Sequence, residues 1–266
     1  MKVGRWWATL ALVVLAPTAT GVGARAAGRR VRPLFEPTDL ELEEAGTVEA
    51  DLQTGWVRGS DADRLVIPDL EIDLGLLPNL EIDLDGAYAI AGPDGGGWGL
   101  DHAAPDSLWA ALKLGIASVD WPDQAAGVGL GVQIGPKFPV APGTHGLGFE
   151  AVLLAGARRG RWHVALNLGG FADPGAEGGG ERPRGLEAGL DFDLDLDAAG
   201  IWSLTGELGG VAFVSSDPHQ LVATAGIAWS VRPDLDLSLT GLWGFLDGGD
   251  RAGLILGLSP KISLWH

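Results

Sequence analysis

Carboxylates at alternate positions are the residues of this sequence with the most chemistry to offer. In "DFDLDLD", single apolar residues separate Asp191, Asp193 and Asp195, and residues 81–86, "EIDLDG", repeat the arrangement. Alternate side chains of an extended strand lie on one face, about 6.5–7 Å apart, so only carboxylates from neighbouring strands could complete a cation site. Residues 81–86 also begin like an EF-hand loop, yet Gly92 stands where that loop needs a Glu. We interpret both runs as polar strand faces and expect no dedicated metal site.

Residue types used in catalysis are present but are not arranged as an active site. The chain has no Cys, which excludes disulfides, thiolate nucleophiles and thiolate metal ligands. No H-E-x-x-H, G-x-S-x-G or Walker-type sequence occurs. Of the five histidines, only His163 lies in the middle of an expected strand. The others are His102, His145, His219 and His266. We therefore expect neither an enzyme nor a bound cofactor.

The first residues have the composition of a secretory signal peptide. Lys2 and Arg5 precede a short apolar run, and an A-x-A cleavage pattern ends at Ala26. The apolar run is too short for a stable membrane span, and no later stretch reaches about 18 consecutive apolar residues. We expect residues 1–26 to be cleaved, with an uncleaved anchor as the alternative, and residues 27–45 to form a polar N-terminal leader.

The chain is strongly acidic, with a formal net charge of −17 at pH 7. Proteins that bind nucleic acid need a basic surface to neutralise phosphates, so no nucleic-acid partner is expected. Acidity alone is equally consistent with plain solubility. The positions of the acids in the sequence must decide whether the acidity serves solubility alone or a function.

Beyond the leader, apolar and polar residues alternate in runs that are separated by turn residues. Period-two alternation of this kind is typical of β-strands. The expected strands cover residues 46–57, 65–76, 79–91, 106–118, 126–137, 146–158, 161–172, 184–197, 201–213, 219–231, 234–246 and 252–265. Each is long enough to cross a bilayer, for which a strand needs roughly 9–11 residues.

The alternation leaves open which face points inward. In "PDLDLSLTGLWGF", the leucines share one parity, and Asp236, Ser238 and Thr240 share the other. The leucines would fill the core of a soluble sandwich, but they would face lipid in an outer-membrane barrel, whose acids would line the interior. Short links such as "LLPN", "RRGR" and "VRPD" alternate with longer, Gly-rich links, as they do in bacterial barrels. The sequence thus predicts an all-β fold, a single transmembrane antiparallel up-and-down β-barrel of about twelve strands over residues 46–266.

Tryptophans fall near the ends of the expected strands. Trp162, Trp202 and Trp229 lie beside short links, and Trp56 and Trp243 lie near longer ones. These are the positions of two interfacial aromatic belts, with packing in a soluble core as the alternative. We therefore expect the protein in the outer membrane of a Gram-negative bacterium, in contact with outer-membrane lipid and, during insertion, with the outer-membrane assembly machinery.

The polar parity of the strands supplies the candidate site residues. They are expected to line the interior and are Glu71, Asp73, Glu81, Asp83, Asp85, Lys113, Glu150, Arg158, His163, Asn167, Glu187, Asp191, Asp193, Asp195, Glu207, Asp236 and Lys261. Carboxylates enclosed by a low-dielectric wall repel one another unless water or cations enter. We expect a hydrated interior that prefers cations. The alternative is a packed network of acids and bases that plugs a narrow barrel.

Several short segments are similar to those of one known family. "EPTDLELEEAGTVEADLQTGW" pairs Thr38-Asp39 with a later G-T-x-x-x-E/D strand, "DSLWAALKLGI" carries a Gly/Ala-x-Lys element at Lys113, and "WHVALNLGGF" contains His163 and Asn167 on one strand. "LVATAGIAWSVRPDLDLSLTGLWGF" resembles the start of a closing hairpin. In these segments the chain resembles the outer-membrane barrels of the MetA-pathway of phenol degradation family. The resemblance implies an outer-membrane barrel that passes small, often aromatic or apolar, compounds, and it brings no catalytic residues.

These observations predict a passive channel or transporter for small-molecule solutes, with an acidic, cation-preferring interior. Two alternatives stay open. One is a non-conducting structural or surface-interaction barrel whose Gly-rich loops, 92–99 and 174–180, contact partners. The other is a soluble periplasmic binding barrel with its leucines inside.

Overall fold

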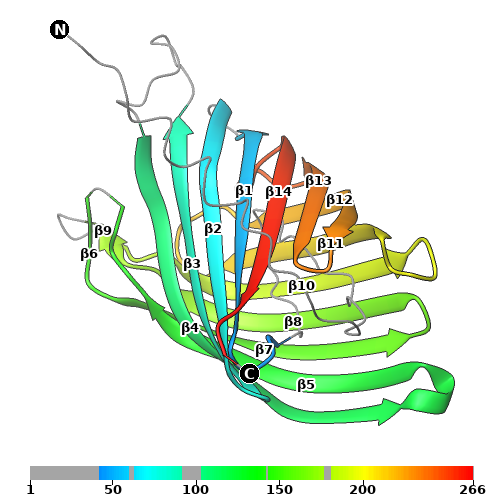
Figure 1. Ribbon diagram of the computed structural model, residues 1–266. Coiled ribbons are helices and arrows are strands. Elements are labelled where there is room, and N and C mark those ends of the chain that lie inside the picture. Colours follow the sequence, from blue (N-terminus) through cyan, green and yellow to red (C-terminus); the bar gives the residue numbers. More distant parts are fainter. Residues whose placement is uncertain (1–41, 60–62, 92–102, 142, 177–180, 266) are drawn as a thin grey trace, which may run out of the picture.

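The computed structural model describes residues 42–59, 63–91, 103–141, 143–176 and 181–265 (Figure 1). The expected signal peptide, all but the last four residues of the expected leader, loop 92–99 and residues 177–180 lie outside this part of the chain. Within the described residues, no helix has the length and apolar character needed to cross a membrane.

Twelve long strands form a closed antiparallel barrel, which confirms the predicted fold (Figure 1). They are β1 (Thr47–Arg58), β2 (Asp63–Leu77), β3 (Leu80–Ala91), β4 (Ala103–Trp121), β5 (Ala126–Lys137), β7 (Gly148–Arg159), β8 (Trp162–Ala172), β10 (Arg184–Asp195), β11 (Trp202–Phe213), β12 (Gln220–Arg232), β13 (Leu235–Gly244) and β14 (Ala252–Ser263). Each pairs with its neighbours along the chain, and β1 pairs with β14 to close the barrel from Thr47↔Ser263 to Arg58↔Ala252.

The two ends of the barrel differ in their connections. The turn end carries the links 78–79, 122–125, 160–161, 196–201 and 233–234, and the start of β1 and the end of β14 also lie there. The loop end carries the links 59–62, 92–102, 138–147, 173–183, 214–219 and 245–251. In the link between β7 and β8, Gly160 has φ +59°, as the first central position of a type II′ hairpin turn requires.

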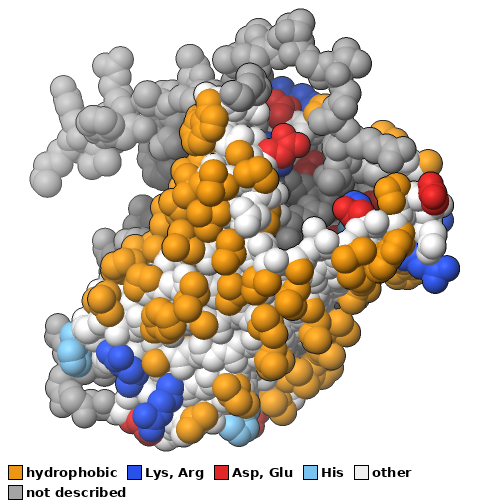
Figure 2. Space-filling view, turned by 90° about the horizontal axis from the view of Figure 1, so that it is seen from below, with side chains coloured by type: hydrophobic (Ala, Val, Ile, Leu, Met, Phe, Trp, Pro, Cys, Tyr) orange, Lys and Arg blue, Asp and Glu red, His pale blue; other side chains and the backbone are white. Residues whose placement is uncertain are grey.

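Side-chain parity places aliphatic residues outside the barrel and polar residues inside it. On β14, Leu254 and Leu256 point outward and are 53 % and 55 % exposed, whereas Ser259 points inward and is 2 % exposed. The same alternation recurs on the other strands, and apolar side chains spread over the outer wall (Figure 2). Most of the leucines therefore lie on the outer wall and do not form an internal core, contrary to the soluble-barrel alternative.

Tryptophans mark the outer wall at the turn end. Trp202 of β11 and Trp229 of β12 are cross-strand partners whose rings stack with centroids 5.3 Å apart. Both are more than a third exposed, as is Trp162 at the start of β8. Their positions match those expected of an interfacial belt.

Two features of the fold differ from the sequence prediction. Strand β4 runs from Ala103 to Trp121 and includes residues that were expected to form a link, because pairing with β5 continues as far as Trp121↔Ala126. The short strands β6 (Thr144–His145) and β9 (Gly175–Ala176) pair between two long links at the loop end. Two-residue strands leave no period-two pattern, so the sequence did not indicate them.

Candidate functional site: the acid-lined interior of the barrel

Inward-facing carboxylates gather toward the turn end of the interior. Ten of them are at most 9 % exposed, because period-two alternation turns them away from the outer wall. We call this group the acid zone, and it comprises Glu49, Asp51, Glu71, Asp73, Glu81, Asp83, Asp191, Asp193, Glu207 and Asp236.

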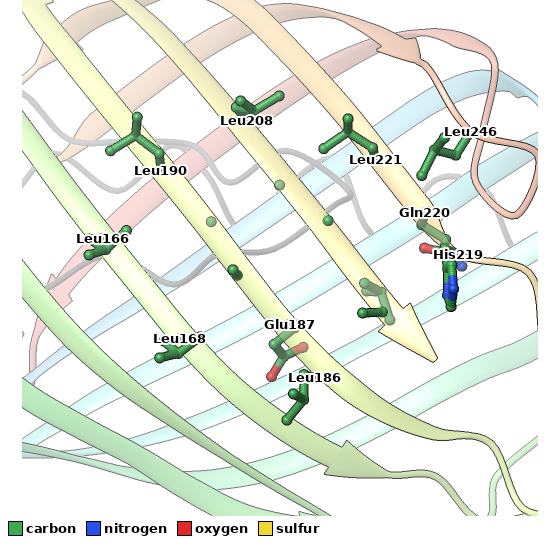
Figure 3. A pocket seen from close by; sticks show the side chains of 16 residues that line it. Leu166, Leu168, Leu186, Glu187, Leu190, Leu208, His219, Gln220, Leu221 and Leu246 are labelled. Carbon is green, nitrogen blue, oxygen red and sulfur yellow. The ribbon is translucent and has the colours of Figure 1, made fainter. Parts of the chain in front are cut away.

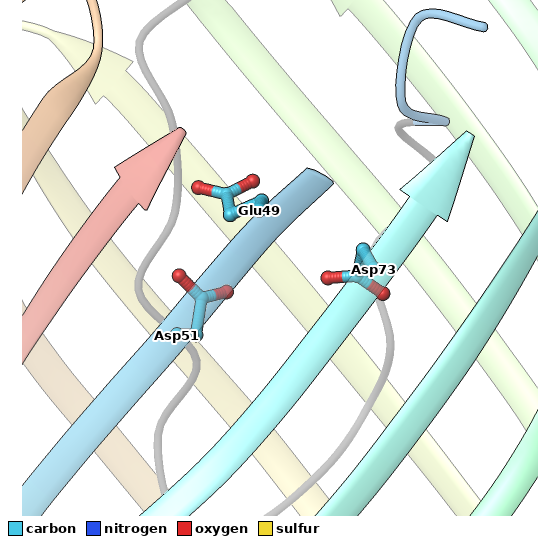
Figure 4. A group of neighbouring side chains, drawn as sticks. All are labelled: Glu49, Asp51 and Asp73. Carbon is cyan, nitrogen blue, oxygen red and sulfur yellow. The ribbon is translucent and has the colours of Figure 1, made fainter. Parts of the chain in front are cut away.

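The register between β1, β2 and β3 brings acids of the acid zone into contact. Glu49 and Asp73 are cross-strand partners, as are Asp73 and Asp83. Carboxylate oxygens of Glu49, Asp51 and Asp73 lie within 4.8 Å of one another (Figure 4), and so do those of Glu71, Asp73 and Asp83. Carboxylates this close favour a cation between them. Among the described residues, these two groups are the ones able to share a metal ion.

Positive and amide side chains face the acid zone from β4 and β5. The ammonium group of Lys113 lies 3.5 Å from a carboxylate oxygen of Glu81, and both side chains are buried. The side-chain amide of Gln133 donates a hydrogen bond to Asp83 across β4. The interior therefore contains a polar network that spans several strands as well as a ladder of acids.

Toward the loop end a second ionic group includes an aromatic pair. Lys137 lies 2.8 Å from both Glu150 and Asp173, and its ammonium group is 5.2 Å from the centre of the Phe171 ring. The Phe171 ring packs edge-on against Phe213, with centroids 5.7 Å apart. The Lys137 ammonium group is therefore attracted both by the two carboxylates and by the face of the Phe171 ring.

Apolar side chains also face inward, mostly toward the loop end. One buried cluster joins Trp109, Ala111, Val152 and Leu154, and another joins Val222, Leu242 and Ile255. Polarity therefore changes along the interior, from acids near the turn end to apolar groups farther on.

The structure places the sequence-predicted site residues in three environments. Inward and buried are Glu71, Asp73, Glu81, Asp83, Lys113, Glu150, Asn167, Asp191, Asp193, Glu207 and Asp236. Inward but only half-buried are Asp85, His163, Glu187, Asp195 and Lys261. Arg158 lies apart from these residues, near the turn end. Its side chain is 55 % exposed, and its guanidinium group lies 2.7 Å from a carboxylate oxygen of Asp120.

Several interior residues were missed by the sequence prediction. Glu49, Asp51 and Gln53 are buried on β1, and Gln133 is buried on β5. The segment "TVEADLQ" alternates as clearly as the segments that were used, so its parity could have identified the first three. Leu154 shares its parity with Glu150, which was predicted to face inward, so the same parity could also have placed Leu154 inside.

The residues before β1 cross the inner face at the turn end, and we call residues 42–46 the inner strap. The backbone N–H of Glu43 donates to a carboxylate oxygen of Glu81, and the Glu43 carboxylate lies 2.7 Å from the Lys261 ammonium group. The inner strap passes so close to β2 that a Cβ on Gly75 would lie 2.3 Å from the Glu44 carbonyl oxygen. The inner strap therefore narrows this end of the interior.

The outer wall carries an apolar groove of about 560 Å³ over β8, β10, β11 and β12. Leu166, Leu190, Leu208 and Leu221 are among the side chains that line it (Figure 3). The groove is shallow and apolar, unlike the acid zone on the other side of the wall.

Comparisons with known proteins identify the fold but not the family. No family model matches the chain, and no curated protein matches it significantly in sequence. An outer-membrane channel from Pseudomonas putida F1 is 11 % identical with a TM-score of 0.60, over 86 % of this chain and all of that one. The NanC porin is 10 % identical with a TM-score of 0.57, over 80 % of this chain and all of that one. The KdgM porin is 8 % identical with a TM-score of 0.50, over 80 % of this chain and 98 % of that one. The chain thus has the fold of outer-membrane channel barrels.

Proposed function

We propose that the protein is an outer-membrane barrel that acts as a passive channel for small solutes and prefers cations. The observation that carries this proposal is the opposite chemistry of the two faces of one closed wall. Exposed leucines cover the outside, and the ten carboxylates of the acid zone face the inside. An apolar belt suits lipid, and an acid-lined enclosure attracts cations and repels anions.

The proposal includes a route to the membrane. An exported chain whose residues 1–26 are cleaved would be delivered to the outer-membrane assembly machinery and inserted into the outer membrane of a Gram-negative bacterium. The resemblance to the MetA-pathway of phenol degradation family supports small-solute transport. The acid zone favours polar or cationic solutes over the apolar ones that this family name suggests.

Ion selectivity in a planar bilayer tests the proposal. Under a KCl gradient across the bilayer, we expect a reversal potential whose sign shows that K⁺ permeates more readily than Cl⁻. Replacing Glu49→Gln, Asp51→Asn and Asp73→Asn together removes all three carboxylates of one close group and one carboxylate of the other, and should reduce the selectivity. The turn-end variant Asp234→Asn serves as the control and should leave it unchanged. Anion selectivity of the unmodified protein would overturn the proposal.

A non-conducting structural barrel is the second candidate, and the burial of the interior favours it. Glu49 and Gln133 are 0 % exposed and Glu81 is 1 % exposed, which fits a packed polar network better than a wide aqueous pore. Liposome swelling separates the two functions. Swelling that depends on solute size supports a channel, and its absence for all small solutes supports the structural role.

A further inference from the structure

The register of four strands builds the apolar groove on the outer wall. Ala188 of β10 pairs with Leu168 of β8 and with Gly210 of β11. Gly210 pairs in turn with Leu221 of β12. All four residues belong to the outward parity. Two positions with a short side chain or none therefore lie between two leucines, and they form the floor of the groove (Figure 3).

The groove occupies the loop-end half of the wall. Leu190 and Leu208 are cross-strand partners near the middle of their strands, and they bound the groove there. In the other direction the groove continues past Ala212 to His219 at the loop end. The stretch of β10 from Leu190 to Leu186 covers about 14 Å, and the hydrocarbon core of one leaflet is about 15 Å thick. The groove therefore has the length of a single acyl chain and lies at the depth of one leaflet.

Polar groups able to bind an anion stand at the loop-end mouth of the groove. Arg184 lies on the outward parity of β10, two residues and about 7 Å beyond Leu186. Its guanidinium group lies 3.9 Å from Glu181, and the Arg184 side chain is still 58 % exposed. His219 lines the groove directly before β12, on the other side of β11.

The spacing of these two residues suits a phosphate group. Neighbouring strands are about 4.8 Å apart, so the backbones at Arg184 and His219 are about 10 Å apart across β11. A guanidinium group binds phosphate through two parallel hydrogen bonds, and an imidazole N–H can donate another. The mouth of the groove therefore complements a negatively charged headgroup, and its floor complements an apolar chain.

We propose that the groove binds one molecule of an anionic phospholipid, with an acyl chain between Leu168 and Leu221 and the phosphate between Arg184 and His219. The groove is continuous with the leucine-covered wall that faces lipid in the proposed function, and the inference rests on that membrane location. It does not depend on which solutes pass or on whether the barrel conducts.

Native mass spectrometry of the full-length, detergent-extracted protein tests the site. The probes are phosphatidylglycerol, whose headgroup is anionic, and phosphatidylcholine with the same acyl chains, whose headgroup has no net charge. Ala188→Phe fills the floor of the groove, and Ala212→Phe fills it nearer the mouth. The matched control is Ala110→Phe, at an outward position of β4 opposite Leu84 of β3 and outside the groove. A faster migration of the unheated sample on a gel shows which variants are folded barrels.

The expected result is one phosphatidylglycerol bound to the unmodified protein and to Ala110→Phe, with at least tenfold less bound to a folded variant with a filled groove. Phosphatidylcholine should bind more weakly to the unmodified protein, and Arg184→Gln with His219→Gln should remove the difference between the two lipids. The proposal is wrong if the unmodified protein retains neither lipid, if it binds both equally, or if filling the groove has no more effect than Ala110→Phe. A complex of two chains that Ala188→Phe disrupts would show that a second copy covers the groove, which also overturns it.

Failure of this site and failure of the proposed function give different results. A closed barrel that is recovered from the membrane fraction but retains no phosphatidylglycerol refutes the lipid site alone. Anion selectivity in a planar bilayer refutes the cation-preferring channel and leaves the lipid site standing.

Discussion

Lys113 and Glu81 illustrate at the scale of single residues how the interior carries its charges. Both side chains are buried and their charged groups lie 3.5 Å apart. Removing one partner of a buried ion pair leaves a charge with less compensation and costs about 3–5 kcal/mol. We predict that Lys113→Met lowers the free energy of unfolding, measured by urea denaturation, by about 3 kcal/mol.

The double variant Lys113→Met/Glu81→Gln is the control for this prediction. Glu81→Gln keeps an oxygen that accepts the hydrogen bond from the backbone of Glu43 but removes the negative charge. Most of the lost stability should therefore return. Equal losses in the single and double variants would contradict a role for the ion pair.

Asp197 is a second residue whose charge state has a measurable consequence. It lies in the link between β10 and β11, where its carboxylate accepts hydrogen bonds from the backbone N–H groups of Trp202, Ala199 and Ile201, at 2.9, 2.8 and 3.3 Å. The bond from Trp202 is the largest cause of a lowered pKa for Asp197, since it stabilises the charged form. A lowered folded-state pKa means that the stabilisation is present above the unfolded pKa, about 3.9, and is lost as the pH falls through the folded value.

We therefore predict that Asp197→Asn is less stable than the unmodified protein at pH 7. The difference should begin to shrink as the pH falls below about 4, where the carboxylate of the unfolded chain becomes protonated, and should disappear once the pH has passed the lowered pKa of the folded state. Urea unfolding of both proteins at pH 7 and at a pH below about 4 measures this difference in stability. Asp234→Asn serves as the control for loss of a carboxylate in a turn. A difference that grows at low pH would be inconsistent with this assignment.

At the scale of the strand, the outward parity defines a depth-dependent apolar belt. Leu190 lies midway along β10 and is 44 % exposed, whereas Leu246 lies in a loop-end link and is 41 % exposed. An Arg on the lipid face costs about 2–4 kcal/mol at the bilayer midplane and about 0–1 kcal/mol near the interface. We predict that Leu190→Arg is destabilised by about 3 kcal/mol in lipid vesicles, and Leu246→Arg by less than a third of that. Equal effects would argue against a membrane-spanning belt.

Strand parity could be read from the sequence, but contacts between strands could not. The spacing within "DFDLDLD" or "EIDLDG" correctly predicts strands, and it also shows that one strand cannot surround a cation. The group of Glu49, Asp51 and Asp73 exists because the register of β1 against β2 pairs Glu49 with Asp73. Register depends on the turns and on both faces of the sheet, so no single segment encodes it. The inward Val152 and Leu154 were missed for a different reason: they share the parity of Glu150, but only polar residues were taken as candidates for the interior.

At the scale of the whole molecule, pairing of β1 with β14 closes the barrel and leaves it no free sheet edge. We predict that the protein from the membrane fraction migrates faster on a gel when loaded unheated than after boiling, as a closed barrel retained in detergent does. A folded sample with identical mobility before and after heating, recovered without detergent, would argue against a membrane barrel.

The central claim is that one parity of each strand faces lipid and the other faces the interior. Single Cys substitutions along β10 at residues 186–194, labelled with an environment-sensitive fluorophore in vesicles that contain a lipid-borne quencher, test it most directly. The account predicts strong quenching at Leu186, Ala188, Leu190, Phe192 and Leu194, and weak quenching at the positions between them. Quenching with no period of two, or with the opposite phase, would contradict it.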